Sequence, residues 1–147
     1  MANILYNAGL RDLLTNLRTF DAATYLILLE RDTSTYTPDK DHASLLNQAG
    51  WAEISVTSYG RQTVAGINIT ADNTNDRAII DCGNADFGSL ESGQTVKSII
   101  VARDDAGNLV PLLRIDDDAS NLLPRALGGG NFAVNIHATG LITFAQA

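Results

Sequence analysis

Residues 98–114 read SIIVARDDAGNLVPLLR, two apolar runs joined by the polar segment 104–108. Isoleucine, valine and leucine favour strands, and a short joining segment that contains glycine and asparagine favours a tight turn. We therefore predict a β-hairpin in which Gly107 and Asn108 supply the positive φ angles of the turn. Pro111 has no amide hydrogen for a ladder bond, so the second strand is expected at a sheet edge or with a bulge.

The same pattern of strand and turn repeats on both sides of this hairpin. From Trp51, the apolar residues Ala52, Ile54 and Val56 alternate with polar neighbours, which is the period expected of a strand with one buried face. Further strand-like segments are 61–71, 77–81, 95–103, 109–115 and 131–144. They are separated by turn-forming stretches at 72–75, 83–93, 104–108 and 116–130. With the apolar run 23–30, these segments make about seven strands, which need two layers to bury their apolar faces, so we predict a mainly β protein, an antiparallel, jelly-roll-like β-sandwich.

The N-terminal part of the chain has a helical periodicity instead. The leucines that fall at positions i, i+3, i+4 and i+7 are Leu10, Leu13, Leu14 and Leu17. This spacing lines one face of a helix, which we predict over residues 8–19 with Asn7 as its cap. The segment 1–20 is expected to pack on the sandwich, as part of a single domain over residues 1–147.

Two further elements precede Trp51. The apolar run 23–30 is short and rich in β-branched and aromatic residues, which predicts a strand buried on both faces at the centre of a sheet. The turn-forming segment 33–41 follows it. Residues 42–48 then allow a second short helix, ended by Gly50.

Composition and charge exclude several classes of partner. The chain carries 17 acidic against 10 basic residues, a formal net charge of −7, and its basic residues are scattered, so neither nucleic acid nor a membrane is expected as a partner. Cys82 is the only cysteine, so no intrachain disulfide can form, and we expect Cys82 to be a small buried hydrophobe. Residues 1–18 lack a signal-peptide pattern, and no apolar run reaches the about 18–20 residues of a membrane span, so synthesis in the cytoplasm is expected.

No catalytic constellation can be assembled from the sequence. The two histidines, His42 and His137, are accompanied by no nucleophile motif, and each is expected to have a structural or solvent role. The run Gly128–Gly130 is followed by Asn131 rather than by the Gly-Lys-Ser/Thr of a phosphate loop, so it is expected to bend the chain or to admit another backbone. The chain is therefore predicted not to be an enzyme, with no catalytic and no cofactor-binding residues.

Two acidic clusters, 104–105 and 116–118, carry oxygen ligands of the kind that calcium prefers. Neither has the spacing of an EF-hand loop, and we interpret both as solvated ends of hairpins, with no metal site. Acid–base chemistry by paired carboxylates is left open, because any aspartate-rich turn has the same sequence.

Trp51 and the segment Tyr59-Gly-Arg61 are candidates for recognition. Tryptophan, tyrosine and arginine are the residues that most often dominate binding interfaces. Packing inside the protein is the alternative for Trp51, and the sequence leaves the two open. The residues that bind a partner therefore stay unknown.

Four segments together resemble a known group of proteins. They are Tyr36-Thr-Pro-Asp39, Asp41-His42, residues 53–64 (EISVTSYGRQTV) and residues 135–144 (NIHATGLITF). The segments are similar to small virion proteins of tailed bacteriophages, described as capsid decoration (cement) proteins or tail-associated proteins. The resemblance implies a β-sandwich without catalytic residues that assembles into a symmetric oligomer and adheres to the capsid or tail.

The expected function is therefore that of a decoration protein on a phage capsid. Its partners would be further copies of itself, a trimer being suggested by the three-fold axes of icosahedral shells, and the major capsid protein. The protein would be located in the virion after synthesis in the host cytoplasm. The alternatives are a tail, collar, fibre or baseplate component, and a carbohydrate- or receptor-binding module that uses Trp51, Tyr59 and calcium.

Overall fold

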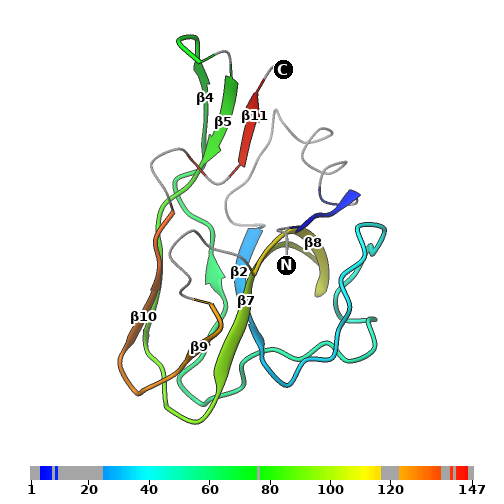
Figure 1. Ribbon diagram of the computed structural model, residues 1–147, viewed down its shortest axis with the longest axis vertical. Helices are drawn as coiled ribbons and strands as arrows, with labels where there is room; N and C mark the ends of the chain where they lie inside the picture. The colour runs from blue at the N-terminus through cyan, green and yellow to red at the C-terminus, as the bar shows by residue number, and fades with distance from the viewer. Residues whose placement is uncertain are drawn as a thin grey trace.

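The computed structural model describes residues 4–7, 9, 25–75, 77–116, 123–136, 140 and 142–145. Within them the regular structure is β-strand, and all strand pairs are antiparallel (Figure 1). The strands are β1 (Ile4–Leu5), β2 (Tyr25–Arg31), β3 (Gln62–Thr63), β4 (Asn68–Asp72), β5 (Arg77–Asp81), β6 (Ala85–Ser89), β7 (Thr95–Asp105), β8 (Asn108–Ile115), β9 (Arg125–Ala126), β10 (Asn131–Val134) and β11 (Ile142–Ala145). The predicted mainly β, antiparallel character is confirmed.

The largest sheet has six strands, in the order β1-β8-β7-β2-β3, with β9 paired to β7. β2 is buried on both faces, as predicted, because Ile27 and Leu29 belong to one core cluster and Leu28 to another. β2 also lies inside the sheet, as predicted, between β7 and β3. β7 pairs with β8, β2 and β9, whereas the second neighbour of β2 is the two-residue strand β3.

The predicted hairpin is formed by β7 and β8. Asp105 pairs with Asn108, so the turn consists of Ala106 and Gly107 alone. Both have positive φ, 51° for Ala106 and 89° for Gly107, as in the type I′ turn that matches the twist of the strands. Asn108 was expected to share this role with Gly107, and the structure assigns it to Ala106 instead. The Asp104 carboxylate accepts a hydrogen bond of 2.8 Å from the Gly107 amide, which closes the turn.

Because alanine is disfavoured in the left-handed region, Ala106 is expected to be a point of stored strain. Ala106→Asn should raise the free energy of unfolding by about 0.5–1 kcal/mol, since asparagine followed by glycine is the favoured pair for this turn. Ala106→Val should lower it by about 1–2 kcal/mol, because a β-branched side chain is poorly tolerated there. Urea unfolding of the two variants and the parent protein measures both changes, and an equal response to Asn and Val would contradict this account of the turn.

Pro111 lies at a bulge, as one of the two predicted alternatives required. Ala102 pairs with Pro111 and Val101 with Leu113, which leaves Leu112 as an extra residue in β8. The extra residue is not lost to the fold, because the Leu112 side chain is buried in the larger core cluster. The bulge thus accommodates Pro111, which has no backbone amide hydrogen, and lets the next residue, Leu112, place its side chain in the core.

Two smaller sheets complete the described fold. β5 lies between β4 and β11, and β6 pairs with β10. Two strands predicted as continuous are divided: 61–71 between β3 and β4, and 131–144 between β10 and β11. The prediction of a turn region over 83–93 is wrong, because it contains β6. The strand predicted over residues 51–57 is not formed, and the segment makes only a single β-bridge, between Glu53 and Glu30.

The larger core cluster draws on all three sheets. Ile27 and Val101 come from the six-stranded sheet, Phe87 and Phe132 from the pair β6–β10, and Ile80 from β5. The opposite face of the six-stranded sheet carries a second cluster, composed of Leu28, Tyr36, Leu45, Ile100, Ala102 and Leu109. Burial on both faces explains why β2 and β8 are almost continuously apolar.

The short helix predicted over residues 42–48 is not formed. Leu45 donates its amide to the carbonyl of Leu109 at 2.9 Å, and the Ser44 hydroxyl donates to Asn108, so the segment is bonded to the start of β8. Within the segment the Gln48 amide donates to the Leu45 carbonyl at 3.0 Å, which makes an isolated turn and not a helix. Gly50 does end the segment, with a φ of 79°. The other predicted helix, over residues 8–19, lies outside the described residues, apart from Gly9.

Candidate functional site

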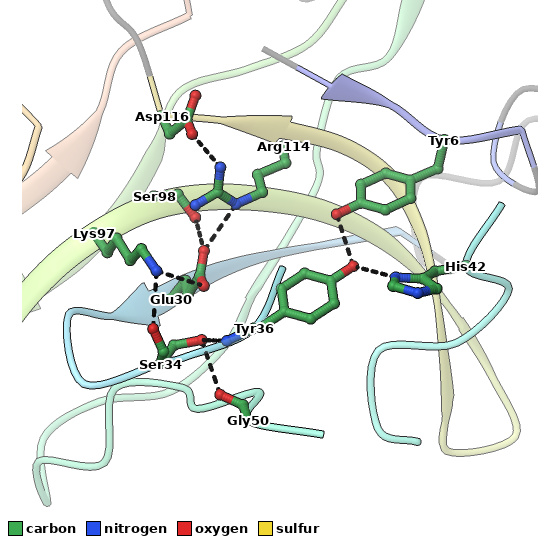
Figure 2. A network of polar contacts seen from close by, with 10 residues as sticks. All are labelled: Tyr6, Glu30, Ser34, Tyr36, His42, Gly50, Lys97, Ser98, Arg114 and Asp116. Atoms are coloured by element: carbon green, nitrogen blue, oxygen red, sulfur yellow. Dashed lines mark hydrogen bonds and ion pairs between the residues drawn. The ribbon is translucent and has the colours of Figure 1, made fainter. Parts of the chain in front are cut away.

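A buried ion pair is the most conspicuous polar feature of the structure (Figure 2). The register of the sheet places Ser98 on β7 directly opposite Glu30 on β2, and Arg114 on β8 opposite Ile100. Arg114 Nε donates to Glu30 Oε2 at 2.9 Å, and the Ser98 hydroxyl donates to the same carboxylate oxygen. The side chains of Glu30 and Arg114 are 0% and 1% exposed, so this pair ties three neighbouring strands together inside the protein.

Lys97 and Asp116 extend the pair at its two ends. Lys97 Nζ lies 3.8 Å from Glu30 Oε1 and donates to the carbonyl of Ser34 at 2.8 Å, while Arg114 also binds Asp116. Two positive and two negative side chains therefore neutralise one another. Burial by itself lowers the pKa of Arg114, but the carboxylates of Glu30 and Asp116 outweigh it, and the net pKa of the guanidinium lies above its ordinary value.

A second polar chain starts from the N-terminal strand (Figure 2). The hydroxyls of Tyr6 and Tyr36 are 3.0 Å apart, and the Tyr36 hydroxyl is also 3.0 Å from Nδ1 of His42. The edge of Trp51 packs against the Tyr36 ring at a centroid distance of 5.8 Å. These contacts fix the segment 34–51 on the sheet, and they give His42 the structural role that was predicted for it.

A third cluster is centred on Glu53. Arg61 holds the Glu53 carboxylate with its Nε and Nη2, at 3.0 and 2.9 Å, and the Tyr59 hydroxyl donates to the same carboxylate. Tyr59 also accepts a hydrogen bond of 3.1 Å from the amide of Leu29 on β2. Its ring stacks on Phe87 at 5.8 Å, which connects this segment to β6.

Side-chain hydrogen bonds fasten the same segment to the loop before β7. The Gln94 amide group accepts from the Ser55 backbone at 2.9 Å and donates to the Ser55 hydroxyl at 3.0 Å. Glu91 accepts from the Thr57 backbone at 2.9 Å, and its own amide donates to the Ser58 hydroxyl at 3.1 Å. The two loops thus hold each other in place of a strand pairing.

Three phenols in these clusters make the protein sensitive to alkaline pH. Burial is the main cause that raises the pKa of Tyr6, Tyr36 and Tyr59 above the ordinary value. The folded state therefore keeps protons that the unfolded chain loses near pH 10, so stability is fully present below about pH 10 and falls above it. Tyr59→Phe should reduce this fall by about 1.4 kcal/mol per pH unit.

Urea unfolding between neutral and strongly alkaline pH measures this slope. The value for Tyr59→Phe at neutral pH serves as the control, since it isolates the cost of the lost hydrogen bonds from the titration. An unchanged slope in the variant would mean that Tyr59 ionises in the folded protein as easily as in the unfolded chain.

The remaining residues singled out in the sequence are dispersed. Asp104 and Asp105 lie at the exposed end of the β7–β8 hairpin, where Asp105 pairs with Arg103, and this agrees with solvated carboxylates. Cys82 is buried with a free thiol, as predicted. Gly129 has a φ of 82°, and the space beside all three glycines of 128–130 is open, so the run bends the chain without admitting another backbone. The interpretation of the cluster 116–118 as a solvated end is wrong for Asp116, whose side chain is 4% exposed and binds Arg114. His137 and the acidic residues 117–118 lie outside the described residues.

The candidates for recognition contact other residues of the same chain. Trp51 packs on Tyr36, Tyr59 on Phe87, and Arg61 on Glu53. The sequence did not single out Glu30 and Arg114, which form the most buried ion pair in the described part of the chain. The available signal was weak: one carboxylate and one guanidinium, each at the end of an otherwise apolar strand.

Comparison of the chain with protein-family models, with curated proteins and with solved structures finds no match in any of the three. In the described part of the chain, no three His, Cys, Asp or Glu side chains are grouped so that they could hold a metal ion. The described residues also contain no helix that is long and apolar enough to cross a lipid bilayer.

Proposed function

We propose that the protein is a structural component of a tailed-phage virion, and that it acts as a decoration protein that binds and stabilises the major capsid shell. The observation that carries the proposal is how the residues behind the phage resemblance are used. Tyr36 bonds His42, and Glu53 bonds both Tyr59 and Arg61. These contacts within the chain fix the shape of the loops. A protein whose function is to bind other proteins through its surface requires loops of fixed shape.

We further propose that the sheets form the two-layer sandwich expected from the sequence. Its support is the larger core cluster, in which Phe87 and Phe132 of β6 and β10 are buried together with Ile27 and Val101 of the six-stranded sheet. Two layers that pack closely on a shared apolar core form a rigid body. A rigid body with few groups to order on binding loses little conformational entropy at an interface.

The charge of the protein suits the same role. A decoration protein accumulates as a soluble molecule before it adds to a finished shell, and a net charge of −7 opposes premature association. A stable contact with the shell then needs an interface of about 1,200–2,000 Å² in total. In this proposal the partners are the major capsid protein and further copies of the chain.

Quantitative mass spectrometry of purified virions tests the proposal. A decoration protein is expected at a copy number comparable with that of the major capsid protein, and a reconstruction of the particle should contain this chain on the outer shell. Absence from the particle contradicts a virion role. A few copies per particle contradict decoration and favour a tail, collar, fibre or baseplate component.

A second test uses the isolated protein. Shells that lack it are expected to bind it and to disrupt at a higher temperature after binding, because a ligand that binds only the intact state stabilises that state. Glycan arrays with and without a chelator test the alternative of a calcium-dependent sugar-binding module, and specific binding there would count against the decoration role.

A further inference from the structure

β4 is an edge strand that lacks the usual protection against pairing. It pairs with β5 on one side and with no other strand among the described residues (Figure 1). Residues 68–71 are all exposed, and Ile69 is 42% exposed, one of two large hydrophobic residues so placed in the described part. Free backbone donors and acceptors beside exposed apolar groups are the features by which one strand recruits another.

The sequence of β4 contains none of the devices that block such recruitment. Natural edge strands use lysine, proline, a bulge or an inward charge for this purpose. β4 reads Asn68-Ile-Thr-Ala-Asp72, and its register with β5 has no bulge. Its single charge, on Asp72, is held by Arg77 at 2.7 Å.

The strand is also complementary to itself. In antiparallel pairing with a second copy about a two-fold axis, the middle residue, Thr70, lies opposite its own counterpart. Ile69 then lies opposite Ala71, and Asn68 opposite Asp72. The pairs are threonine with threonine, isoleucine with alanine, and asparagine with aspartate, so the first two are favourable across strands and none opposes like charges.

The two faces of the sheet agree with this register. Ile69 and Ala71 share a face with their partners on β5, Ile80 and Ala78. Ile80 is buried in the core, whereas Ala78 is exposed, so an apolar surface runs from the core out to the β4 edge. A second copy paired at this edge continues the apolar surface across the two-fold axis.

We propose that two copies of this chain associate through β4, in antiparallel register centred on Thr70, to form a sheet continuous across both subunits. The occupant of the edge is a second copy because the sequence is self-complementary in a closed two-fold contact, and its single charge, on Asp72, is neutralised by Arg77. This inference does not depend on the proposed virion function.

Charge pairs at position 70 test the register. Thr70→Lys and Thr70→Glu each place like charges opposite each other at the axis, so each variant alone is expected to be monomeric by light scattering, at micromolar concentrations where the parent protein is a dimer. An equimolar mixture of the two variants is expected to recover the dimer as a heterodimer. Thr70→Ser is the matched control and should remain dimeric.

A parent protein that is monomeric throughout, or a trimer that persists in Thr70→Lys, overturns the proposal. Failure of the mixture to dimerise overturns the register. Unfolding curves confirm that the variants fold, since substitution at an exposed site should change the free energy of unfolding by no more than about 0.5 kcal/mol.

A disulfide provides a readout that does not depend on charge. Thr70→Cys is expected to form a disulfide-linked dimer on mild oxidation, because directly opposite residues have Cα atoms about 4.5–5.5 Å apart. Ala71→Cys is the matched control, since its counterpart is displaced by two residues and the Cα atoms exceed the limit of about 7 Å. Equal linkage of the two variants overturns the register, and Cys82 does not compete because it is buried.

Discussion

Replacement of Arg114 by methionine is expected to lower the free energy of unfolding by about 3–5 kcal/mol. The guanidinium lies 2.9 Å from Glu30 Oε2, and both side chains are almost completely buried. Methionine fills most of the space but leaves the Glu30 carboxylate without its nearest cation in a site that water does not reach. The cost comes from that uncompensated charge more than from the lost attraction.

The neighbours of Glu30 cannot replace Arg114. Ser98 already donates to the carboxylate, and Lys97 lies 3.8 Å from its other oxygen, which is beyond hydrogen-bonding distance. Asp116 also binds Arg114 and loses that contact in the same variant. The predicted loss is therefore set mainly by the Glu30 carboxylate, which stays buried without its nearest cation.

Urea unfolding of three variants separates these effects. Arg125→Met is the control for the arginine-to-methionine change, because Arg125 is exposed and packs over the Phe132 ring at 5.1 Å; it should cost about 1 kcal/mol or less. The double variant Glu30→Met/Arg114→Met should cost clearly less than the sum of its single variants. If Arg114→Met costs no more than Arg125→Met, the buried pair does not hold these strands together.

The sequence predicted best what depends on neighbouring residues. The hairpin 98–114 was foreseen because its turn and both apolar runs are local, and β2 because its continuous apolar run requires burial on both faces. Of the two residues predicted to have positive φ in the turn, one was correct. Gly107 has the predicted positive φ, but the register makes Ala106 its partner, and a register is set by the whole ladder.

Elements that depend on distant partners were missed. β6 reads Ala85-Asp-Phe-Gly-Ser89, and aspartate and glycine are depleted in strands. It forms because β10 pairs with it, and Gly88, with a φ of 67°, lies where the register of that pairing shifts. The failed helix at 42–48 has the same cause, since hydrogen bonds to Asn108 and Leu109 replace those of a helical turn.

The polar clusters could not be predicted from the sequence because their members also come from distant parts of the chain. Glu30 and Arg114 are separated by 84 positions, and only the order β8-β7-β2 brings them together. Tyr59 and Arg61 were recognised as residue types suited to binding a partner protein, but the residue that they bind, Glu53, belongs to the same chain. Residue type therefore predicted which side chains make strong contacts, and the topology decided that those contacts are made within the chain.

Phe87→Ala is expected to lower the free energy of unfolding by about 3–5 kcal/mol. Phe87 is 6% exposed and stacks on Tyr59 at 5.8 Å, while the Phe132 ring meets it edge-on at 6.0 Å. These three rings come from β6, β10 and the segment that bonds β2. Truncation of the central ring leaves a cavity that its neighbours cannot fill, at the place where the proposed second layer meets the large sheet.

Chemical denaturation measures the loss, and hydrogen exchange locates it. The amides of β6 and β10 should lose protection before those of β2 and β7, because Phe87 and Phe132 contribute to the apolar core between the pair β6–β10 and the large sheet. Leu46→Ala is the control for truncation of a large apolar residue at an exposed site, since Leu46 is 48% exposed, and it should change stability by about 0.5 kcal/mol or less. If both truncations cost the same, the β6–β10 pair does not pack as a layer, and the proposed sandwich is wrong.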